Sequence, residues 1–132
     1  MSLLTPELRA ALRQQACSDA ADKRPLAKLF NPMGAATWLA SELGEDGDTL
    51  FGLADLGFGC PELGYFSLRE IEALRLPFGM RIERDLTFAT RHSLAVWAAW
   101  SRKAGSILSA EALLRRATAT GSDLADRFPP SG

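Results

Sequence analysis

Two stretches of the chain have the apolar spacing and the end signals of an amphipathic helix. The first begins at Thr5, which can cap free backbone N–H groups and is followed by Pro and Glu in the first turn. Its apolar positions recur with a helical period until about Cys17. The second begins at Ser67, where Glu70 completes a capping box, and it stops before Pro77. We expect a helix in each stretch.

Alternating apolar and polar positions predict strands in four other stretches, which are residues 26–30, 37–43, 49–56 and 81–88. Short links rich in Gly, Asn and Asp join the first three, which favours an antiparallel meander. In the fourth, Ile82, Leu86 and Phe88 share the apolar side, and Arg84 is a charge in register with them. We therefore expect an α+β domain. It should contain an antiparallel sheet of about four strands flanked by two helices, with a helical C-terminal extension.

Beyond Thr90 the pattern changes. Residues 94–100 are helical by composition and apolar nearly all the way round, which is typical of a buried helix or an interface. Trp97 and Trp100 share one side of this helix, so they either pack in the core or form a dimer contact. Ser109 can cap a last helix. The chain thus divides into an α+β domain over 1–90, a helical extension over 91–120 that packs on it or forms an interface, and a flexible tail over 121–132.

Composition places the chain among ordinary globular proteins. Its 132 residues suit one domain, and its content of 47% apolar and 23% charged residues is typical of the class. No apolar run approaches the ~20 residues of a membrane span. The start of the chain lacks the pattern of a secretory signal. We therefore expect a cytoplasmic protein that does not engage a membrane.

The net charge of −1 conceals an uneven distribution. Residues 29–68 contain six acidic side chains and no Lys or Arg. The net charge is −4 over residues 1–90 and +3 over residues 91–132. An acidic body argues against direct nucleic-acid binding through a basic patch. It is compatible with a protein that mimics DNA to block a nuclease, although −4 is a small charge for that role.

Acidic and aromatic residues of the predicted strands are the strongest functional candidates: Trp38, Glu42, Asp55, Glu62, Tyr65, Glu83, Arg84 and Asp85. Carboxylates on neighbouring strands can hold a hard cation or perform acid–base chemistry. The alternative is a solvated polar face with an Arg–Asp ion pair. Arg84 either pairs with a nearby carboxylate, because a lone buried charge is costly, or holds an anionic ligand. Six residues make up the candidate ligand site: Trp38, Glu62, Tyr65, Glu83, Arg84 and Asp85.

The remaining motifs are incomplete. Residues 46–48 begin like a calcium loop but lack its third acidic position. The glycines at 57, 59 and 64 do not have the spacing of a dinucleotide fingerprint, and no P-loop lysine follows them. His92 is the only histidine, which excludes a His-rich metal site, and no nucleophile motif supports a triad with it. We therefore assign no catalytic residue, no metal and no cofactor, and an enzymatic function is not favoured.

Several blocks of the chain resemble one bacterial family. They are Thr5-Pro6-Glu7-Leu8, Lys28-Leu29-Phe30-Asn31-Pro32, Thr37-Trp38, Leu50-Phe51-Gly52-Leu53, Pro61-Glu62-Leu63-Gly64-Tyr65-Phe66-Ser67-Leu68 and Ile82-Glu83-Arg84-Asp85. In sequence and spacing they resemble a bacterial domain-of-unknown-function family, number 2958, over residues 3 to about 90. The resemblance implies a small stand-alone protein of the kind frequently associated with plasmids and integrative elements. It carries over no catalytic residue.

Three functions stay open. The first is a non-enzymatic binding or adaptor protein of mobile genetic elements, with a protein partner and a candidate homodimer contact through residues 94–100. The second is an enzyme or small-ligand-binding protein, which requires the acidic, Arg and Tyr side chains of the candidate site to converge on one pocket. The third is the acidic DNA mimic.

Overall fold

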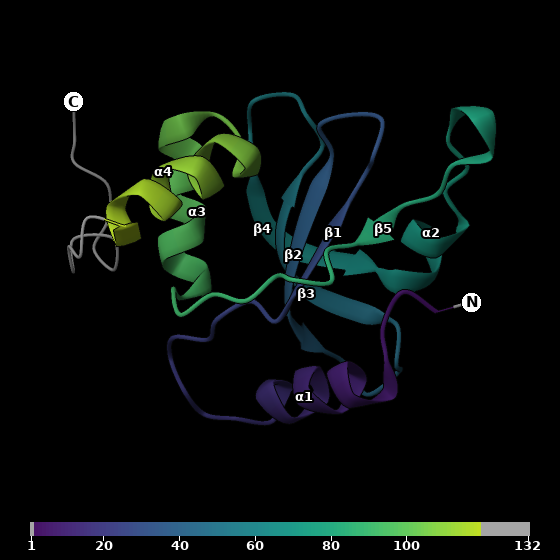
Figure 1. The fold of residues 1–132 in the computed structure, drawn as a ribbon. Coiled ribbons are helices and arrows are strands. Elements are labelled where there is room, and N and C mark those ends of the chain that lie inside the picture. The colour runs from purple at the N-terminus through teal and green to yellow at the C-terminus, as the bar shows by residue number, and fades with distance from the viewer. Residues whose placement is uncertain (1, 120–132) are drawn as a thin grey trace.

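The chain forms a five-stranded antiparallel sheet with helices on both of its faces (Figure 1). This computed structural model describes residues 2–119, so the tail predicted over 121–132 lies outside the described residues. The elements in chain order are α1 (Pro6–Ala16), β1 (Ala27–Phe30), β2 (Thr37–Leu43), β3 (Thr49–Asp55), β4 (Glu62–Ser67), α2 (Leu68–Ala73), the 3₁₀ helix η1 (Pro77–Gly79), β5 (Glu83–Arg84), α3 (Leu94–Ala104) and α4 (Ile107–Ala119). None of the helices within residues 2–119 is long and apolar enough to cross a membrane.

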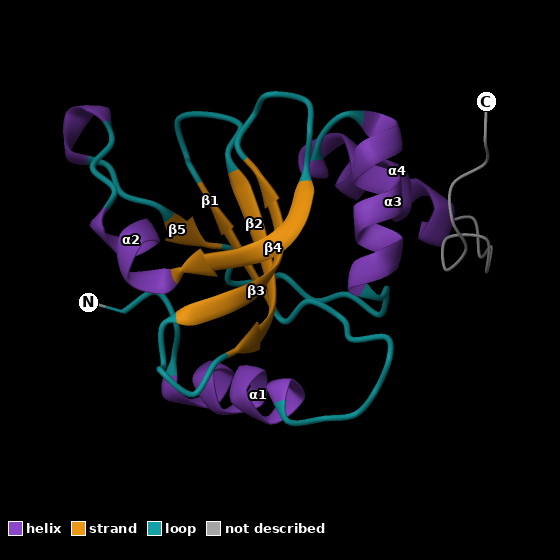
Figure 2. Ribbon diagram, turned by 180° about the vertical axis from the view of Figure 1, so that it is seen from behind, coloured by secondary structure: helices purple, strands orange, loops and turns teal. Residues whose placement is uncertain are grey.

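β1, β2 and β3 form the antiparallel meander predicted over residues 26–56, β4 continues it beside β3, and β5 lies beside β1. The strand order is β4-β3-β2-β1-β5 (Figure 2). β5 pairs with β1 through Arg84 opposite Leu29 and Glu83 opposite Phe30. The α+β class predicted from the sequence is therefore confirmed, with one strand more than the four expected.

The strand predicted over 81–88 is only two residues long, because the chain turns at Asp85. The Asp85 carboxylate accepts hydrogen bonds from the backbone N–H and the hydroxyl of Thr87, at 3.0 and 2.9 Å. This local turn ends the ladder with β1. Leu86 is consequently 79% exposed, so its predicted burial is wrong, whereas Phe88 packs partly against the core.

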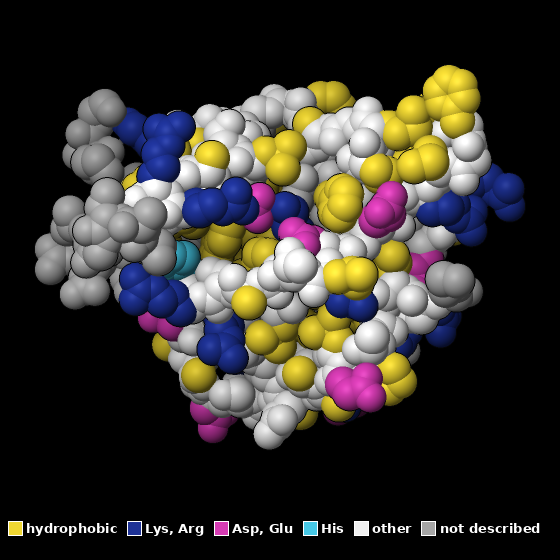
Figure 3. Space-filling model, in the orientation of Figure 1, with side chains coloured by type: hydrophobic (Ala, Val, Ile, Leu, Met, Phe, Trp, Pro, Cys, Tyr) yellow, Lys and Arg dark blue, Asp and Glu magenta, His cyan; other side chains and the backbone are white. Residues whose placement is uncertain are grey.

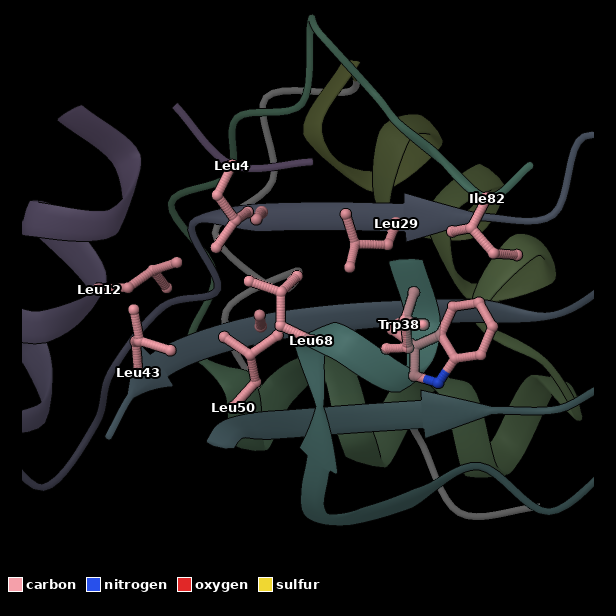
Figure 4. Packing of buried hydrophobic residues seen from close by; sticks show 11 residues of the cluster. Leu4, Leu12, Leu29, Trp38, Leu43, Leu50, Leu68 and Ile82 are labelled. Atoms are coloured by element: carbon pink, nitrogen blue, oxygen red, sulfur yellow. The ribbon is translucent and has the colours of Figure 1, made fainter. Parts of the chain in front are cut away.

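The face of the sheet that packs against α1 and α2, called the α1 face below, is filled with apolar side chains. Leu12 of α1 and Leu68 of α2 are buried against it (Figure 4). Leu29 and Trp38 are cross-strand partners in the same cluster. Burial of such side chains stabilises the fold by about 1.5–3 kcal/mol each. Trp38 thus belongs to the core cluster of the α1 face.

The opposite face, called the α3 face, is covered by α3 and α4. Leu39 and Leu53 are cross-strand partners on this face. They form a second buried cluster with Trp97, Ile107 and Leu114 of the two helices. The C-terminal helices therefore share a core with the sheet.

A buried carboxylate fixes the start of α4. Asp55, the last residue of β3, is fully buried and accepts hydrogen bonds from the N–H groups of Gly57 and Ile107, each at 2.9 Å. Ile107 is the first residue of α4, so Asp55 satisfies an N–H group that a helix start leaves unpaired. This contact explains why α4 begins two residues before Ser109, where the sequence predicted its cap.

Two further carboxylates close the turn between β2 and β3. The carboxylate of Asp46 accepts hydrogen bonds from the hydroxyl and the N–H of Thr49 and from the N–H of Asp48. These bonds, the Thr49 hydroxyl first, lower the pKa of Asp46 from 3.8 to about 2. Asp48 accepts hydrogen bonds from the N–H of Arg69 and the hydroxyl of Ser67 at the start of α2, which lower its pKa. Both side chains thus hold the turn and the helix start in place.

Candidate functional site

The residues that the sequence suggests as a ligand site lie in separate parts of the fold. Trp38 is buried on the α1 face. Glu62 and Tyr65 are exposed on β4 at one edge of the sheet, whereas residues 83–85 lie on or next to β5 at the other edge. Three strands separate these edges, so the six residues do not form one pocket.

Arg84 has a structural partner. Its Nε atom donates a hydrogen bond of 2.8 Å to the backbone carbonyl of Leu3, on the segment that precedes α1. The sequence predicted either a carboxylate partner or an anionic ligand for this side chain. The observed acceptor is instead a carbonyl oxygen, which no sequence pattern indicates. Arg84 thereby fastens the N-terminal segment to the β5 edge.

Asp85 belongs to a charge cluster that the sequence did not reveal, in which Lys28 is buried and Asp85 and Glu111 are half-buried. The Nζ atom of Lys28 lies 2.9 and 3.1 Å from the two carboxylate oxygens of Glu111 and 3.6 Å from Asp85 Oδ2. Arg115 Nη2 lies 3.8 Å from Glu111 on the outer side. Burial raises the pKa of Asp85, but the hydrogen bonds from Thr87 and the Lys28 ammonium outweigh it, so the pKa is lowered. The cluster joins β1, the end of β5 and α4.

A groove of about 470 Å³ opens beside this cluster, between residues 85–92 and the helices α3 and α4 (Figure 3). Trp97 and Leu114 contribute apolar surface to it, and Asp85, Glu111 and Arg115 contribute charges. Figure 3 shows it as a hollow with an apolar floor and charged groups along its border. Its size lies within the range of about 300–1,000 Å³ common for small-molecule sites. The groove is therefore one candidate binding site.

The two tryptophans of the predicted interface helix pack inward. Trp97 is buried, donates a hydrogen bond from Nε1 to the hydroxyl of Thr90 at 3.1 Å, and has its ring centroid 6.1 Å from that of Phe88. Trp100 is partly buried against the same cluster. The core alternative therefore accounts for Trp97, and a dimer contact through residues 94–100 stays a prediction.

A second candidate surface is made of exposed apolar side chains on the loops at the end of the sheet where β1 and β3 finish, on the first turn of α4, and on the η1 turn, which Figure 1 shows standing apart from the two loops. We call it the loop-end surface, and its residues are Met33, Leu56, Phe58, Phe78, Met80 and Leu108. The antiparallel pairing brings the β1–β2 and β3–β4 loops to this end. The two loops touch, because a Cβ atom at Gly57 would lie 3.4 Å from Ala35 Cβ. Figure 3 shows apolar side chains along this upper rim.

Phe78 is the most exposed member of the loop-end surface, at 92%. Its backbone lies in the left-handed region, with φ 61° and ψ 26°, and among the described residues it is the one non-glycine residue with positive φ. This conformation costs an L-residue about 1–2 kcal/mol. Pro77 before it and Gly79 after it, with φ +74°, permit the tight turn. The fold therefore holds an aromatic ring in water at the expense of backbone strain.

Basic side chains accompany the loop-end surface. Arg75 and Arg81 are exposed on either side of Phe78 along the chain. Arg102 and Lys103 occupy the last turn of α3. That turn lies at the same end, because the chain reaches Ile107 beside Asp55 four residues later. This end of the sheet thus carries exposed apolar and basic side chains together with the exposed carboxylates of Glu62 and Glu83.

Comparison with known proteins identifies the family. The family model described as "Protein of unknown function (DUF2958)" matches residues 3–108. The chain belongs to this family. The match confirms the resemblance seen in the sequence and extends it past residue 90, through α3 to the first turn of α4. No curated protein and no solved structure matches the chain.

Sequence reasoning missed the residues that matter most in both candidate surfaces. Nothing in the sequence indicates that Lys28 is buried, because a lysine in an alternating strand is normally interpreted as an exposed position. Glu111 lies 83 residues away in the chain, so the pair appears only in the fold. Phe78 had one usable signal, since the Pro-Phe-Gly sequence marks a turn that places an aromatic at its tip.

Proposed function

We propose that this protein is a non-enzymatic adaptor that binds a protein partner through the loop-end surface. The observation that supports it most directly is Phe78, an aromatic ring at 92% exposure on a strained backbone. Strain of this kind persists where the surroundings enforce it and is concentrated at functional positions. A large exposed aromatic is also the residue type most enriched at interface hot spots.

The charges of the loop-end surface suggest the chemistry of the partner. Arg75 and Arg81 flank Phe78, and Arg102 and Lys103 lie at the same end. A partner with an apolar pocket bordered by Asp or Glu side chains would complement both the ring and the charges. Phe78 would fill the pocket, and the basic side chains would steer association. The binding should therefore weaken as salt rises.

The family supports an accessory role without defining it. The resemblance to family 2958 carries the expectation of bacterial mobile genetic elements, so we propose the partner within plasmid or integrative-element biology. The DNA-mimic alternative has less support. Of the acidic side chains in residues 29–68, Asp55 is buried, and Asp46 and Asp48 accept hydrogen bonds from their own chain. Fewer carboxylates are thereby left to imitate phosphates.

The test is capture of the partner in the native host at near-native expression, with cross-linking and quantitative mass spectrometry. Phe78→Gly removes the ring and also suits the positive φ, so the fold should be retained. Leu86→Ala is the matched control, because Leu86 is a comparably exposed apolar residue outside the loop-end surface. We expect a specific protein that is recovered at least tenfold less with Phe78→Gly and equally with Leu86→Ala. Equal recovery with both variants, or no specific protein with the wild type, contradicts the proposal.

A second candidate function is small-ligand binding in the groove beside Lys28. The supporting observation is an apolar floor that includes Trp97 next to charged Glu111 and Arg115, the composition typical of ligand pockets. A thermal-shift screen against anionic and aromatic metabolites would test it. A hit should be weakened by Arg115→Ala, which alters the rim, and not by Arg102→Ala on the exposed end of α3. A screen without any hit argues against this function.

A further inference from the structure

β4 is an edge strand with an unpaired side. Its six residues pair with β3 in an uninterrupted ladder from Glu62 to Ser67. On its other side β4 has no strand partner in residues 2–119 (Figure 2). The opposite edge of the sheet is the two-residue β5, which offers far less backbone. An edge such as β4 presents a row of N–H and C=O groups to any incoming strand.

The usual features that protect an edge strand are missing from β4. It contains no Lys, no Arg and no Pro, and its pairing with β3 shows no bulge. Glu62 at its first position is its only charge. Leu63 and Tyr65 are both exposed, Tyr65 at 76%. The edge is therefore neutral and apolar along most of its length.

We propose that β4 pairs with β4 of a second copy of this chain, antiparallel and centred on Gly64, to form a two-fold symmetric dimer with a continuous ten-stranded sheet. In this register Leu63 lies opposite Tyr65 of the partner subunit, and Glu62 lies opposite Phe66 of the partner subunit. No two carboxylates face each other, and Leu63 and Tyr65 each meet an apolar side chain of the partner subunit, whereas Phe66 meets Glu62. Both features favour a cross-strand pair. The strand is thus complementary to itself, as an isologous interface requires.

The surroundings of β4 fit this arrangement. The Tyr65 ring already packs against Phe51 with a centroid distance of 5.0 Å. Leu63 and Phe51 line a hollow of about 240 Å³ on the same face. Pairing would place Leu63 of the partner subunit beside the Phe51–Tyr65 contact, and both rings would then be less exposed to water. At the centre, a Cβ atom built on Gly64 meets no atom within 4 Å, so a side chain introduced there to test the register has space on the sheet face.

This inference is independent of the proposed adaptor function, because none of the loop-end residues lies on β4. The dimer would also leave Phe78 accessible on each subunit and give the assembly two binding ends. Two linked ends raise the apparent affinity for a partner that is itself repeated. Failure of one proposal therefore leaves the other standing.

Mass measurement over a concentration series tests the dimer. The full-length wild type should approach twice the monomer mass by light scattering as its concentration rises. Tyr65→Lys should weaken dimerisation at least tenfold, because the two-fold axis brings each lysine against an apolar side chain of the partner subunit. Glu70→Lys is the control, since it adds a positive charge on exposed α2 outside the strand. A monomer at every concentration, or equal effects of both variants, overturns the proposal.

Cross-linking tests the register. In a background with Cys17→Ser and Cys60→Ser, which removes both exposed thiols, Gly64→Cys should form an intersubunit disulfide under mild oxidation. Leu63→Cys should cross-link poorly with itself but efficiently when mixed with Tyr65→Cys, because directly opposite Cβ atoms lie about 4.5–5.5 Å apart. Glu70→Cys is the exposed control and should form no intersubunit disulfide. Self-cross-linking of Leu63→Cys as strong as that of Gly64→Cys would rule out pairing centred on Gly64.

Discussion

The two faces of the sheet are packed by different means. The cluster on the α1 face is made of apolar side chains. The α3 face also has an apolar cluster, yet the buried polar and charged residues of the described chain gather on that side: Lys28, Thr37, Ser41, Asp55, His92 and Ser101. The α1 face therefore has no buried polar side chain within residues 2–119, and the hydrogen bonds that link α1 to the sheet, such as those from Arg13 to Leu43 and from Gln15 to Ser41, come from side chains that are not buried. The α3 face is held by burial and by specific polar contacts.

The difference shows what is required to fix the position of helices that follow the sheet in the chain, as α3 and α4 do. Apolar contacts have no direction, so several arrangements of α3 and α4 could bury the same side chains. Asp55 fixes the first turn of α4, and Lys28 fixes Glu111 one turn later. These contacts select one placement of the helices, a role that buried polar groups have in some proteins at a cost in stability. The same placement forms the groove beside residues 85–92.

We expect the largest effect from Lys28→Ala. It leaves the Glu111 and Asp85 carboxylates without their buried cation, which typically costs about 3–5 kcal/mol. Leu12→Ala on the α1 face should cost a similar amount, about 2–5 kcal/mol, through a cavity. Denaturant unfolding measures both free energies.

The pH dependence separates these two variants. Lys28 helps to hold the pKa of Asp85 below its ordinary value of 3.8, so removing Lys28 raises that pKa, and the destabilisation by Lys28→Ala should shrink as pH falls and the Asp85 carboxylate takes up a proton. The loss from Leu12→Ala should stay constant, because no ionisable group is involved. If both variants lower the free energy of unfolding by the same amount at every pH, the distinction between the two faces is contradicted.

Asp55→Ala should have the next largest effect. It leaves the buried N–H group of Ile107 and the N–H group of Gly57 without this acceptor, at a cost of about 2–3 kcal/mol. Asp55→Asn keeps one carbonyl oxygen and should lose less. Hydrogen exchange should show the first turn of α4 losing protection before the strands do. Uniform loss of protection over the whole chain would mean that Asp55 does not act at α4 specifically.

Ser101→Ala should act in the opposite direction. The Ser101 hydroxyl is fully buried on α3 and has no hydrogen-bond partner in the described part of the chain. Removing it relieves the cost of an unsatisfied buried group and raises helix propensity, so stability should rise by about 1 kcal/mol. Ser93→Ala is the control on the same helix. It removes the N-cap bond to Val96 and should lower stability by about 1 kcal/mol.

Most of the fold could be predicted from the sequence because its signals are local. Thr5 and Ser67 both cap a helix as expected, and the side chain of each accepts a hydrogen bond from a backbone N–H group of the first turn. The meander followed from alternation and short links. The prediction for residues 81–88 was wrong because one Asp side chain competed with the ladder, and alternation alone does not register such a turn.

The candidate surfaces were less predictable because they depend on distant contacts. Two predicted site residues, Trp38 and Arg84, have structural partners on other segments. The charge cluster requires Lys28 and Glu111 to meet across 83 positions. Exposure of Phe78 depends on a turn that leaves it without neighbours. None of these placements can be read from composition or local sequence patterns, because each depends on which distant segments meet in the fold.

We expect the smallest effect from Asp85→Asn, which should change how the free energy of unfolding declines at acid pH. The pKa of Asp85 in the folded chain is lowered from its ordinary value of 3.8 by Thr87 and Lys28, against the effect of burial. A lowered folded-state pKa contributes stability that is present above pH 3.8 and is lost as pH falls through the folded-state value. Asp85→Asn should therefore lower stability at pH 7 and flatten the decline below pH 4. Asp46→Asn offers a comparison at the turn, where the pKa of about 2 moves the same loss to lower pH. If Asp85→Asn leaves the slope between pH 4 and pH 2 unchanged, the α3 face does not owe its pH dependence to this carboxylate.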